Sequence, residues 1–251
     1  TGDAADNSEE CGNAPIMLQD IVCSAGGVAV TGGICRFGSR TEEIMCGIVG
    51  YNGARPVTDF LLDALELLEY RGYDSAGLAT INAETGRTKL RKCAGRVADL
   101  RKVCENDKKQ ATCGIGHTRW ATHGGVSDEN AHPHRQGNVL LVHNGIVENY
   151  EELRDHFMLS KDLKSETDTE VVAGVLNRYY DGDPHKAIAQ TVKHLKGTFA
   201  LVIIFDDIPD VIYAIRNVSP IVAARTEDGT MLASDVAALG SHATEYMVVP
   251  E

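Results

Sequence analysis

The chain has 251 residues, with 24 lysines and arginines against 36 aspartates and glutamates, which gives a formal net charge of −12 at pH 7. This length can bury one large core or two small ones without disulfides, and the acid excess argues against a binding surface for nucleic acid or anionic lipid. No apolar run approaches the ~20 residues that a membrane span needs. We therefore expect a globular cytoplasmic protein with no nucleic-acid or membrane partner.

The first 45 residues differ from the rest of the sequence. They contain the glycine pairs Gly26-Gly27 and Gly32-Gly33, three of the seven cysteines and little hydrophobic periodicity. We expect this extension, residues 1–45, to lie outside the folded domain. It is either a propeptide or upstream sequence with Met45 as the true start, and we favour the second alternative. The odd number of cysteines and their irregular spacing predict free thiols rather than disulfides or metal ligands.

From Met45 onwards, hydrophobic periodicity predicts alternating strands and helices. The predicted strands cover 46–51, 78–82, 87–92, 113–119, 139–143, 199–205, 211–215, 221–224, 231–234 and 246–249. One predicted helix follows Pro56, one ends at 158, and others cover 97–105, 168–180 and 185–196, with Thr167 and Glu170 as a capping box. Strands gathered towards both ends, with helices between them, predict an α+β fold in stacked layers with the sheets inside.

Cys46 directly follows Met45 and is the first residue with a candidate chemical role. Taken by itself it is more simply a small buried residue at the start of a strand. The alternative is a nucleophile, because removal of Met45 would leave Cys46 with a free α-amine. An α-amine with a pKa near ~8 can act as the general base for the thiol of its own residue.

Four histidines gather between residues 117 and 134, namely His117, His123, His132 and His134. Imidazole suits zinc, but the helical histidine pairs of zinc proteases are missing, so a metal site is disfavoured. Arg119 and Trp120 fit a ligand clamp better, since a guanidinium pairs with a carboxylate and an indole covers an apolar stem. A surface ion pair and a core position are the simpler alternatives for these two residues.

Two further candidate sites lie at the ends of predicted elements: Asn144-Gly145 follows a strand, and Asp168 begins a helix. Asn144-Gly145 fits a hairpin turn, but an Asn amide and a Gly N–H can also stabilise a developing oxyanion. Asp168 fits a helix start, where acids are favoured by the helix dipole. An Asp that faces an Arg is also what recognition of a free α-amino acid requires, because both charges of the zwitterion need a partner.

Seven segments recur in the order of a known family: MCGIVGY at 45–51, LEYRGYDSAG at 68–77, HTRWATHG at 117–124, NAHPH at 130–134, HNGIVENY at 143–150, SETDTEV at 165–171 and ASD at 233–235. Together they resemble the glutaminase domain of the glutamine–fructose-6-phosphate aminotransferase family, over residues 46–251. The resemblance implies a class II glutamine amidotransferase with the four-layer α/β/β/α sandwich of N-terminal-nucleophile hydrolases, which has two antiparallel sheets. It implies no metal and no cofactor.

The resemblance also implies roles for particular residues. Cys46 is the nucleophile that forms a γ-glutamyl thioester with L-glutamine, and Asn144 and Gly145 form the oxyanion hole. Arg119, helped by Thr122 and His123, holds the substrate carboxylate, and Asp168 holds its ammonium group. Trp120 covers the pocket, and Arg71 supports the loop of the nucleophile.

Some features of the sequence depart from the family. Val126 stands where a proline is usual, and Val218 where a glycine is usual. The family continues into two sugar-phosphate isomerase domains, so fructose 6-phosphate would be a partner only through segments beyond this sequence, as would a homodimer of the full-length enzyme. Three alternatives stay open: the glutaminase part of amidophosphoribosyltransferase, another class II amidotransferase, or a glutamine-binding domain whose thiol is blocked by the extension.

Overall fold

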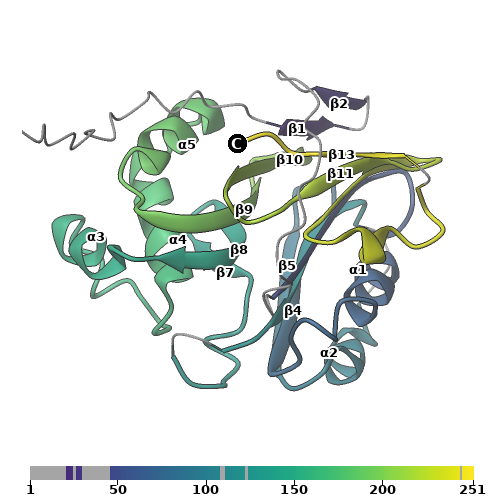
Figure 1. Ribbon diagram of the computed structural model, residues 1–251, viewed down its shortest axis with the longest axis horizontal. Helices are drawn as coiled ribbons and strands as arrows, with labels where there is room; N and C mark the ends of the chain where they lie inside the picture. Colours follow the sequence, from purple (N-terminus) through teal and green to yellow (C-terminus); the bar gives the residue numbers. More distant parts are fainter. Residues whose placement is uncertain (1–20, 25–26, 30–45, 108–110, 122–123, 244) are drawn as a thin grey trace, which may run out of the picture.

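The computed structural model describes residues 21–24, 27–29, 46–107, 111–121, 124–243 and 245–251. Within them, two antiparallel sheets lie between two layers of helices, so the predicted four-layer α+β sandwich is confirmed (Figure 1). The helices are α1 (Val57–Glu66), α2 (Val97–Cys104), α3 (Tyr150–His156), α4 (Asp168–Tyr179), α5 (Pro184–Val192) and the short 3₁₀ helix η1 (Val236–Leu239).

One sheet has seven strands and carries α1 and α2 on its outer face (Figure 1). Its strand order is β13-β11-β12-β3-β6-β4-β5, and each neighbouring pair is antiparallel. The strands are β3 (Gly47–Gly53), β4 (Ser75–Ile81), β5 (Thr88–Ala94), β6 (Cys113–Arg119), β11 (Val222–Arg225), β12 (Gly229–Ala233) and β13 (Tyr246–Val248).

The second sheet has six strands in the order β2-β1-β10-β9-β8-β7 and lies against α4 and α5 (Figure 1). Its strands are β1 (Ile21–Ser24), β2 (Gly27–Ala29), β7 (His134–Gln136), β8 (Val139–Val147), β9 (Gly197–Phe205) and β10 (Ile208–Asn217). The central pairs β8–β9 and β9–β10 form the longest ladders of this sheet.

Three hydrophobic clusters fill the spaces between the four layers. One joins α1 and α2 to the seven-stranded sheet, and one joins α4 and α5 to the six-stranded sheet. The third lies between the sheets and includes Ile48, Ile115, Val142 and Val202, each fully buried. Because β3, β6 and β8 place alternate side chains into this middle layer, their ends bring polar residues from both sheets to one place.

Most predicted elements are present with small shifts at their ends. Strand β6 has the predicted bounds, whereas β8 continues through Asn144-Gly145 to Val147 instead of ending in a turn. The Thr167 side chain accepts a hydrogen bond from the Glu170 N–H, as one half of a capping box does. The three-residue strand β7 was not predicted, because it is too short to show periodicity.

The extension contributes β1 and β2, although residues 1–45 were expected to lie outside the folded domain. For residues 21–24 and 27–29 this expectation is wrong, since β1 pairs with residues 211–214 of β10. Without β1, this edge of β10 would leave N–H and C=O groups unpaired, and Ile21 and Val22 favour extended backbone. The other residues of the extension lie outside the described part of the chain.

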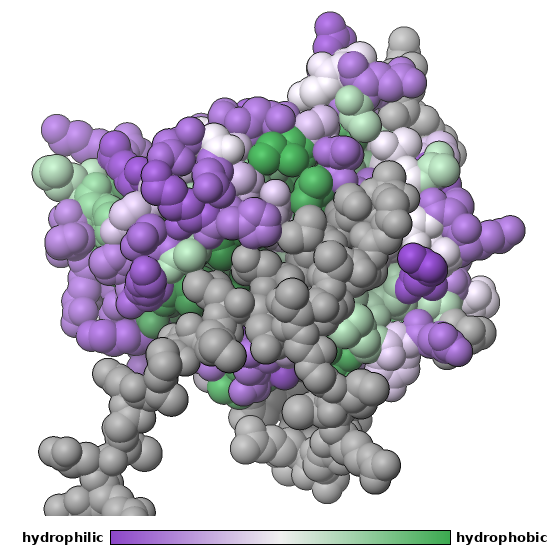
Figure 2. Space-filling view, turned by 90° about the horizontal axis from the view of Figure 1, so that it is seen from above, coloured by the Kyte–Doolittle hydropathy of each residue, from purple (hydrophilic) through white to green (hydrophobic). Residues whose placement is uncertain are grey.

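Seen from above, the face in Figure 2 is dominated by hydrophilic side chains, with smaller hydrophobic areas between them. In the part of the chain that the structure describes, no helix is long and apolar enough to cross a membrane.

Candidate active site

Cys46 lies at the start of β3, and its sulfur contacts the backbone of Trp120. The Trp120 N–H donates to Cys46 Sγ at 3.0 Å, and the thiol lies 3.5 Å from the Trp120 carbonyl oxygen. A Cβ on Gly72 would come within 2.8 Å of the Arg119 carbonyl carbon, so only glycine lets this loop pass so close. The segment after β6 is therefore held directly against the sulfur.

Opposing influences act on the pKa of the Cys46 thiol. Burial raises the pKa and is the largest effect. The Trp120 N–H and the positive charges of Arg119 and Arg71 act in the lowering direction, as does the backbone N–H of Cys46 itself. The net pKa is raised, so this thiol needs a base to become a nucleophile at neutral pH.

The start of β3 is fixed by β12 and the residue after it. The Ile48 N–H donates to Ser234 Oγ at 2.9 Å, and the Ser234 N–H donates to the Ile48 carbonyl at 3.0 Å. A Cβ on Gly47 would lie 2.7 Å from Leu68 Cβ, so a larger residue would push β3 away from the turn that follows α1. These contacts set the position of Cys46 relative to its neighbours.

Two arginines lie near the thiol, Arg119 at the end of β6 and Arg71 in the loop that follows α1. Arg119 is 4% exposed, and its guanidinium donates to the carbonyl oxygens of Gly125 and Gly124 at 3.1 and 3.4 Å. Burial lowers its pKa, while the negative charges of Cys46, Asp168 and Asp74 act to raise it. Arg71 pairs with Asp235 at 2.6 Å and leaves its charge within reach of the sulfur.

The six-stranded sheet brings Asn144 to the same place. Asn144 is buried, and its Nδ2 donates to the Cys46 carbonyl oxygen at 2.7 Å. The next residue, Gly145, has φ +119°, and a Cβ there would lie 2.1 Å from the Thr198 carbonyl oxygen. Only glycine fits this conformation in the β8–β9 ladder, so the sequence requirement at 145 is a backbone one.

Asp168 is the first residue of α4 and is almost fully buried. Its Oδ2 accepts the Val147 N–H at 2.9 Å and lies 3.8 Å from Nδ1 of His143. A carboxylate at a helix N-terminus is also favoured by the helix dipole. Its negative charge acts to raise the pKa of Arg119, so the two opposite charges influence one another within the site.

Six of the predicted site residues lie together in the structure, with Gly145 beside one of them, Asn144. The six are Cys46, Arg71, Arg119, Trp120, Asn144 and Asp168. Thr122 and His123 lie outside the described residues. Trp120 is 37% exposed and stacks edge-on with Tyr73 at 5.5 Å, which fits a cover rather than a core position. Within the described ranges, no group of three or more His, Cys, Asp or Glu side chains could hold a metal ion.

Sequence reasoning missed three residues that support the site. Asp74 accepts the Ala121 N–H at 3.0 Å, Asp235 pairs with Arg71, and His117 contacts Asn144. Asp74 and Asp235 lie in the quoted segments 68–77 and 233–235, which was the only signal for them. His117 was considered only as a metal ligand, although it lies two residues before Arg119 on the same strand.

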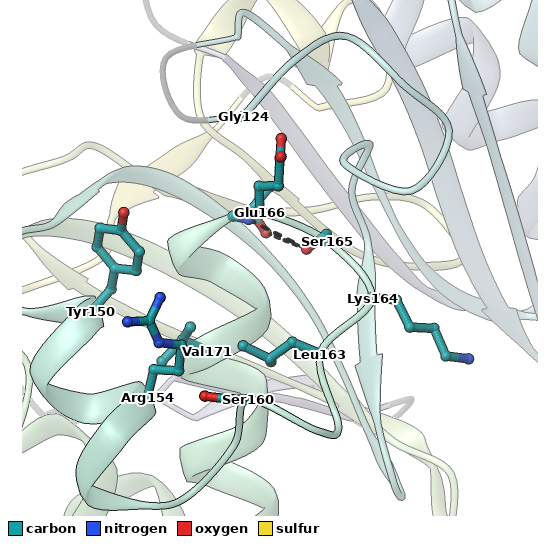
Figure 3. A pocket seen from close by; sticks show the side chains of 10 residues that line it. Gly124, Tyr150, Arg154, Ser160, Leu163, Lys164, Ser165, Glu166 and Val171 are labelled. Carbon is teal, nitrogen blue, oxygen red and sulfur yellow. Dashed lines mark hydrogen bonds between the residues drawn. The ribbon is translucent and has the colours of Figure 1, made fainter.

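A pocket of about 650 Å³ lies next to this cluster of residues, lined by Gly124, Thr167 and residues of α3 and the 160–166 loop. In Figure 3, Tyr150 and Arg154 project from α3 on one side, whereas Lys164 points away from them. Ser165 Oγ and Thr167 Oγ1 lie 2.9 Å apart at its wall. None of the predicted catalytic or binding residues lines this pocket.

Comparison with known proteins gives matches over most of the folded part. A family model described as a glutamine amidotransferase domain matches residues 117–241. Glutamine--fructose-6-phosphate aminotransferase [isomerizing] of Clostridium acetobutylicum is 42% identical over 211 residues, which is 82% of this chain and 34% of that protein. The protein of the same name from Symbiobacterium thermophilum is 46% identical over 210 residues, with the same coverage. The chain therefore spans about a third of the length of these curated relatives.

Solved structures share the fold. The glutamine phosphoribosylpyrophosphate amidotransferase from B. subtilis superposes with a TM-score of 0.66 at 24% identity, over 77% of this chain and 43% of that one. A glutamine aminotransferase class-II domain protein from Silicibacter pomeroyi superposes with a TM-score of 0.54 at 20% identity, over 75% of this chain and 88% of that one.

Proposed function

Because this chain belongs to the glutamine amidotransferase family, we propose that it hydrolyses L-glutamine to glutamate and ammonia, with Cys46 as the nucleophile. The observation that carries the proposal is the double contact of Cys46. The Trp120 N–H lies at its sulfur, and the Asn144 amide lies 2.7 Å from its carbonyl oxygen. A nucleophile and a hydrogen-bond donor from different sheets therefore meet at one point.

In this mechanism, Cys46 Sγ attacks the side-chain amide carbon of glutamine. The thiol proton passes to the α-amine of Cys46, once residues 1–45 are removed or never translated. The backbone N–H of Cys46 is among the groups that act to lower the thiol pKa, which supports an interaction between this nitrogen and its own sulfur. The C=O electron pair moves to the oxygen, where Asn144 Nδ2 and the Gly145 N–H stabilise the negative charge.

Collapse of the tetrahedral intermediate breaks the C–N bond. The α-ammonium returns its proton to the leaving nitrogen, so ammonia departs and a γ-glutamyl thioester remains. Water then attacks the thioester, with the α-amine again as base, and glutamate leaves as the thiol re-forms. No step requires a metal or a cofactor.

Recognition of glutamine uses two buried charges. Arg119 pairs with the α-carboxylate and Asp168 with the α-ammonium, and the influence of the Asp168 charge on the pKa of Arg119 supports this pairing. Thr122 and His123 assist Arg119, Trp120 covers the bound substrate, and Arg71 supports the nucleophile loop. A ligand that lacks the carboxylate or the ammonium group would lose the corresponding ion pair.

The ammonia would serve a larger enzyme. From the names of the relatives, we propose that the whole protein is a glutamine–fructose-6-phosphate aminotransferase, acting in the cytoplasm and making glucosamine 6-phosphate in hexosamine synthesis. Fructose 6-phosphate would bind segments outside this chain, and a homodimer would form through the full-length enzyme. An acceptor screen on the complete gene product tests this part separately from glutamine hydrolysis.

The proposal is tested by relating turnover to the mature N-terminus. We expect glutaminase activity only in protein that mass spectrometry shows to begin at Cys46, and none in Cys46→Ala, which should still bind glutamine. Full activity in molecules that retain residues 1–45 would overturn the α-amine mechanism. Glutamine binding without turnover in protein that begins at Cys46 would instead favour a non-catalytic binding domain.

A further inference from the structure

His117 is a buried histidine that has no part in the mechanism above, yet its ring holds the oxygen of the Asn144 amide. Nε2 of His117 lies 3.1 Å from Asn144 Oδ1 and 3.1 Å from the His143 carbonyl oxygen. We propose that His117 is a positioning residue, whose Nε2–H fixes Asn144 with the amide nitrogen towards the nucleophile. The inference rests on the oxyanion role proposed for Asn144.

The protonation state of His117 follows from its surroundings. The side chain is fully buried, and burial lowers its pKa to about 3, so the ring is neutral at pH 7. Both groups that Nε2 contacts are hydrogen-bond acceptors, so the single proton lies on Nε2. Nδ1 has no hydrogen-bond partner among the described residues, and a proton there would be a buried donor without an acceptor.

This tautomer selects one of the two orientations of the Asn144 amide. In the observed one, Oδ1 accepts from His117 and Nδ2 donates to the Cys46 carbonyl at 2.7 Å. A rotation by half a turn would place two N–H groups together at His117 and two oxygens together at Cys46. It would also put a partial negative charge where the mechanism develops an oxyanion.

The hydrogen bond also joins the two sheets at the site. His117 lies on β6, directly opposite Ile48 of β3, two residues after the nucleophile. Asn144 lies on β8 of the other sheet. On its other side, the His117 ring packs against His132, with 4.2 Å between the ring centroids.

Two substitutions separate the donor from the shape of the side chain. His117→Phe keeps a flat buried ring without an N–H, and His117→Gln keeps an amide donor near the place of Nε2. We expect His117→Phe to lower kcat for glutamine hydrolysis by about 10²-fold, as loss of an oxyanion-hole donor does, with KM changed less than about threefold. His117→Gln should stay within about tenfold of the natural protein.

A double-mutant cycle distinguishes positioning from general stability. In Asn144→Ala, the added His117→Phe change should lower kcat by less than about threefold, because both substitutions act on the same donor. His132→Phe removes the neighbouring buried imidazole and is the matched control, with kcat expected within about threefold. All variants are measured in the protein as its gene produces it, with folding checked by circular dichroism.

The possible outcomes divide clearly. Additive effects of His117→Phe and Asn144→Ala, or equal losses in His117→Phe and His117→Gln, would overturn the inference and leave the proposed function intact. An Asn144→Ala variant with unchanged turnover would reject the oxyanion role itself and the inference with it. If His117→Phe does not fold, His117→Asn replaces it in the cycle, since its shorter amide cannot reach Asn144.

Discussion

The two sheets support their halves of the site in different ways. Asp168 and Gly145, on the six-stranded side, are fixed by the backbone: the Val147 N–H holds the carboxylate, and the β8–β9 ladder holds the glycine. On the seven-stranded side, loops carry Arg71 and Trp120, and these loops are braced by the side chains of Asp235 and Asp74. The six-stranded half is therefore held by backbone hydrogen bonds, and the seven-stranded half by individual side chains.

Substitutions should therefore have different effects in the two halves. Where backbone groups hold a residue, only a change that distorts the strand can move it. Where a carboxylate holds a loop, a single side-chain change can loosen it without unfolding the sheet. The buried histidines His117, His132 and His134 lie in ring contact between the two halves, so protonation at low pH should affect both halves at once.

The largest expected effect is a decrease in the free energy of unfolding at low pH, caused by these buried histidines. Burial lowers the pKa of His117 to about 3 and lowers those of His132 and His134 well below the usual value. Below pH ~6.5 the unfolded chain binds a proton at each histidine and the folded chain does not, so stability is complete above that pH and falls as pH decreases. We expect the free energy of unfolding to fall by about 1.4 kcal/mol per pH unit for each histidine, which is about 4 kcal/mol per pH unit for the three.

Urea unfolding at pH 7, 6 and 5 measures this slope. The same series on His132→Phe is the control, since one histidine fewer should reduce the slope by about a third. A midpoint that stays constant between pH 7 and pH 5 would show that these imidazoles do not oppose protonation in the folded protein.

Gly145→Ala tests the half that the ladder supports. The new Cβ would meet the Thr198 carbonyl at 2.1 Å, and φ +119° is unfavourable for alanine, so β8 must shift and displace Asn144. We expect glutamine turnover to fall by at least about 10²-fold. Gly182→Ala is the matched control: its φ is +102° with nothing within 4 Å, so it should cost about 1 kcal/mol of stability and leave turnover unchanged. Equal turnover in both variants would contradict the argument.

The sequence predicted the elements because periodicity and strand ends are local properties. It placed Cys46, Arg119 and Asp168 at the start or end of elements, where the structure has them. Periodicity could not predict that Asn144 reaches Cys46, because this contact joins residues 98 positions apart on different sheets, and only the resemblance to the family placed both residues in one site. Strand β1 was also missed, since its pairing depends on the edge that β10 offers and not on its own periodicity.

Asp235→Asn tests the half that side chains support. The substitution keeps an acceptor for the Ala237 N–H but removes the charge that pairs with Arg71 at 2.6 Å. We expect kcat to fall on the order of 10-fold as the loop near Cys46 loosens, with little change in stability. Asp228→Asn removes the comparable Arg55 ion pair, at 2.7 Å, and contacts no residue of the site, so its kcat should not change. If both variants keep full turnover, the Arg71 brace has no catalytic effect.

Val218→Gly changes a residue that belongs to neither half and should have the smallest effect. Val218 has φ +71°, where a β-branched side chain is strained by about 1–2 kcal/mol, and it is half exposed, so little burial is lost. Glycine relieves the strain but gives the unfolded chain more freedom, which offsets about 0.5–1 kcal/mol. We expect a net gain near 1 kcal/mol, or about 2–4 °C in Tm, with unchanged glutaminase activity.

Val126→Gly is the control, because Val126 is equally exposed but has no positive φ, so the same substitution there should not raise Tm. A rise in Tm at both positions would mean that loss of an exposed valine, and not relief of backbone strain, stabilises the fold.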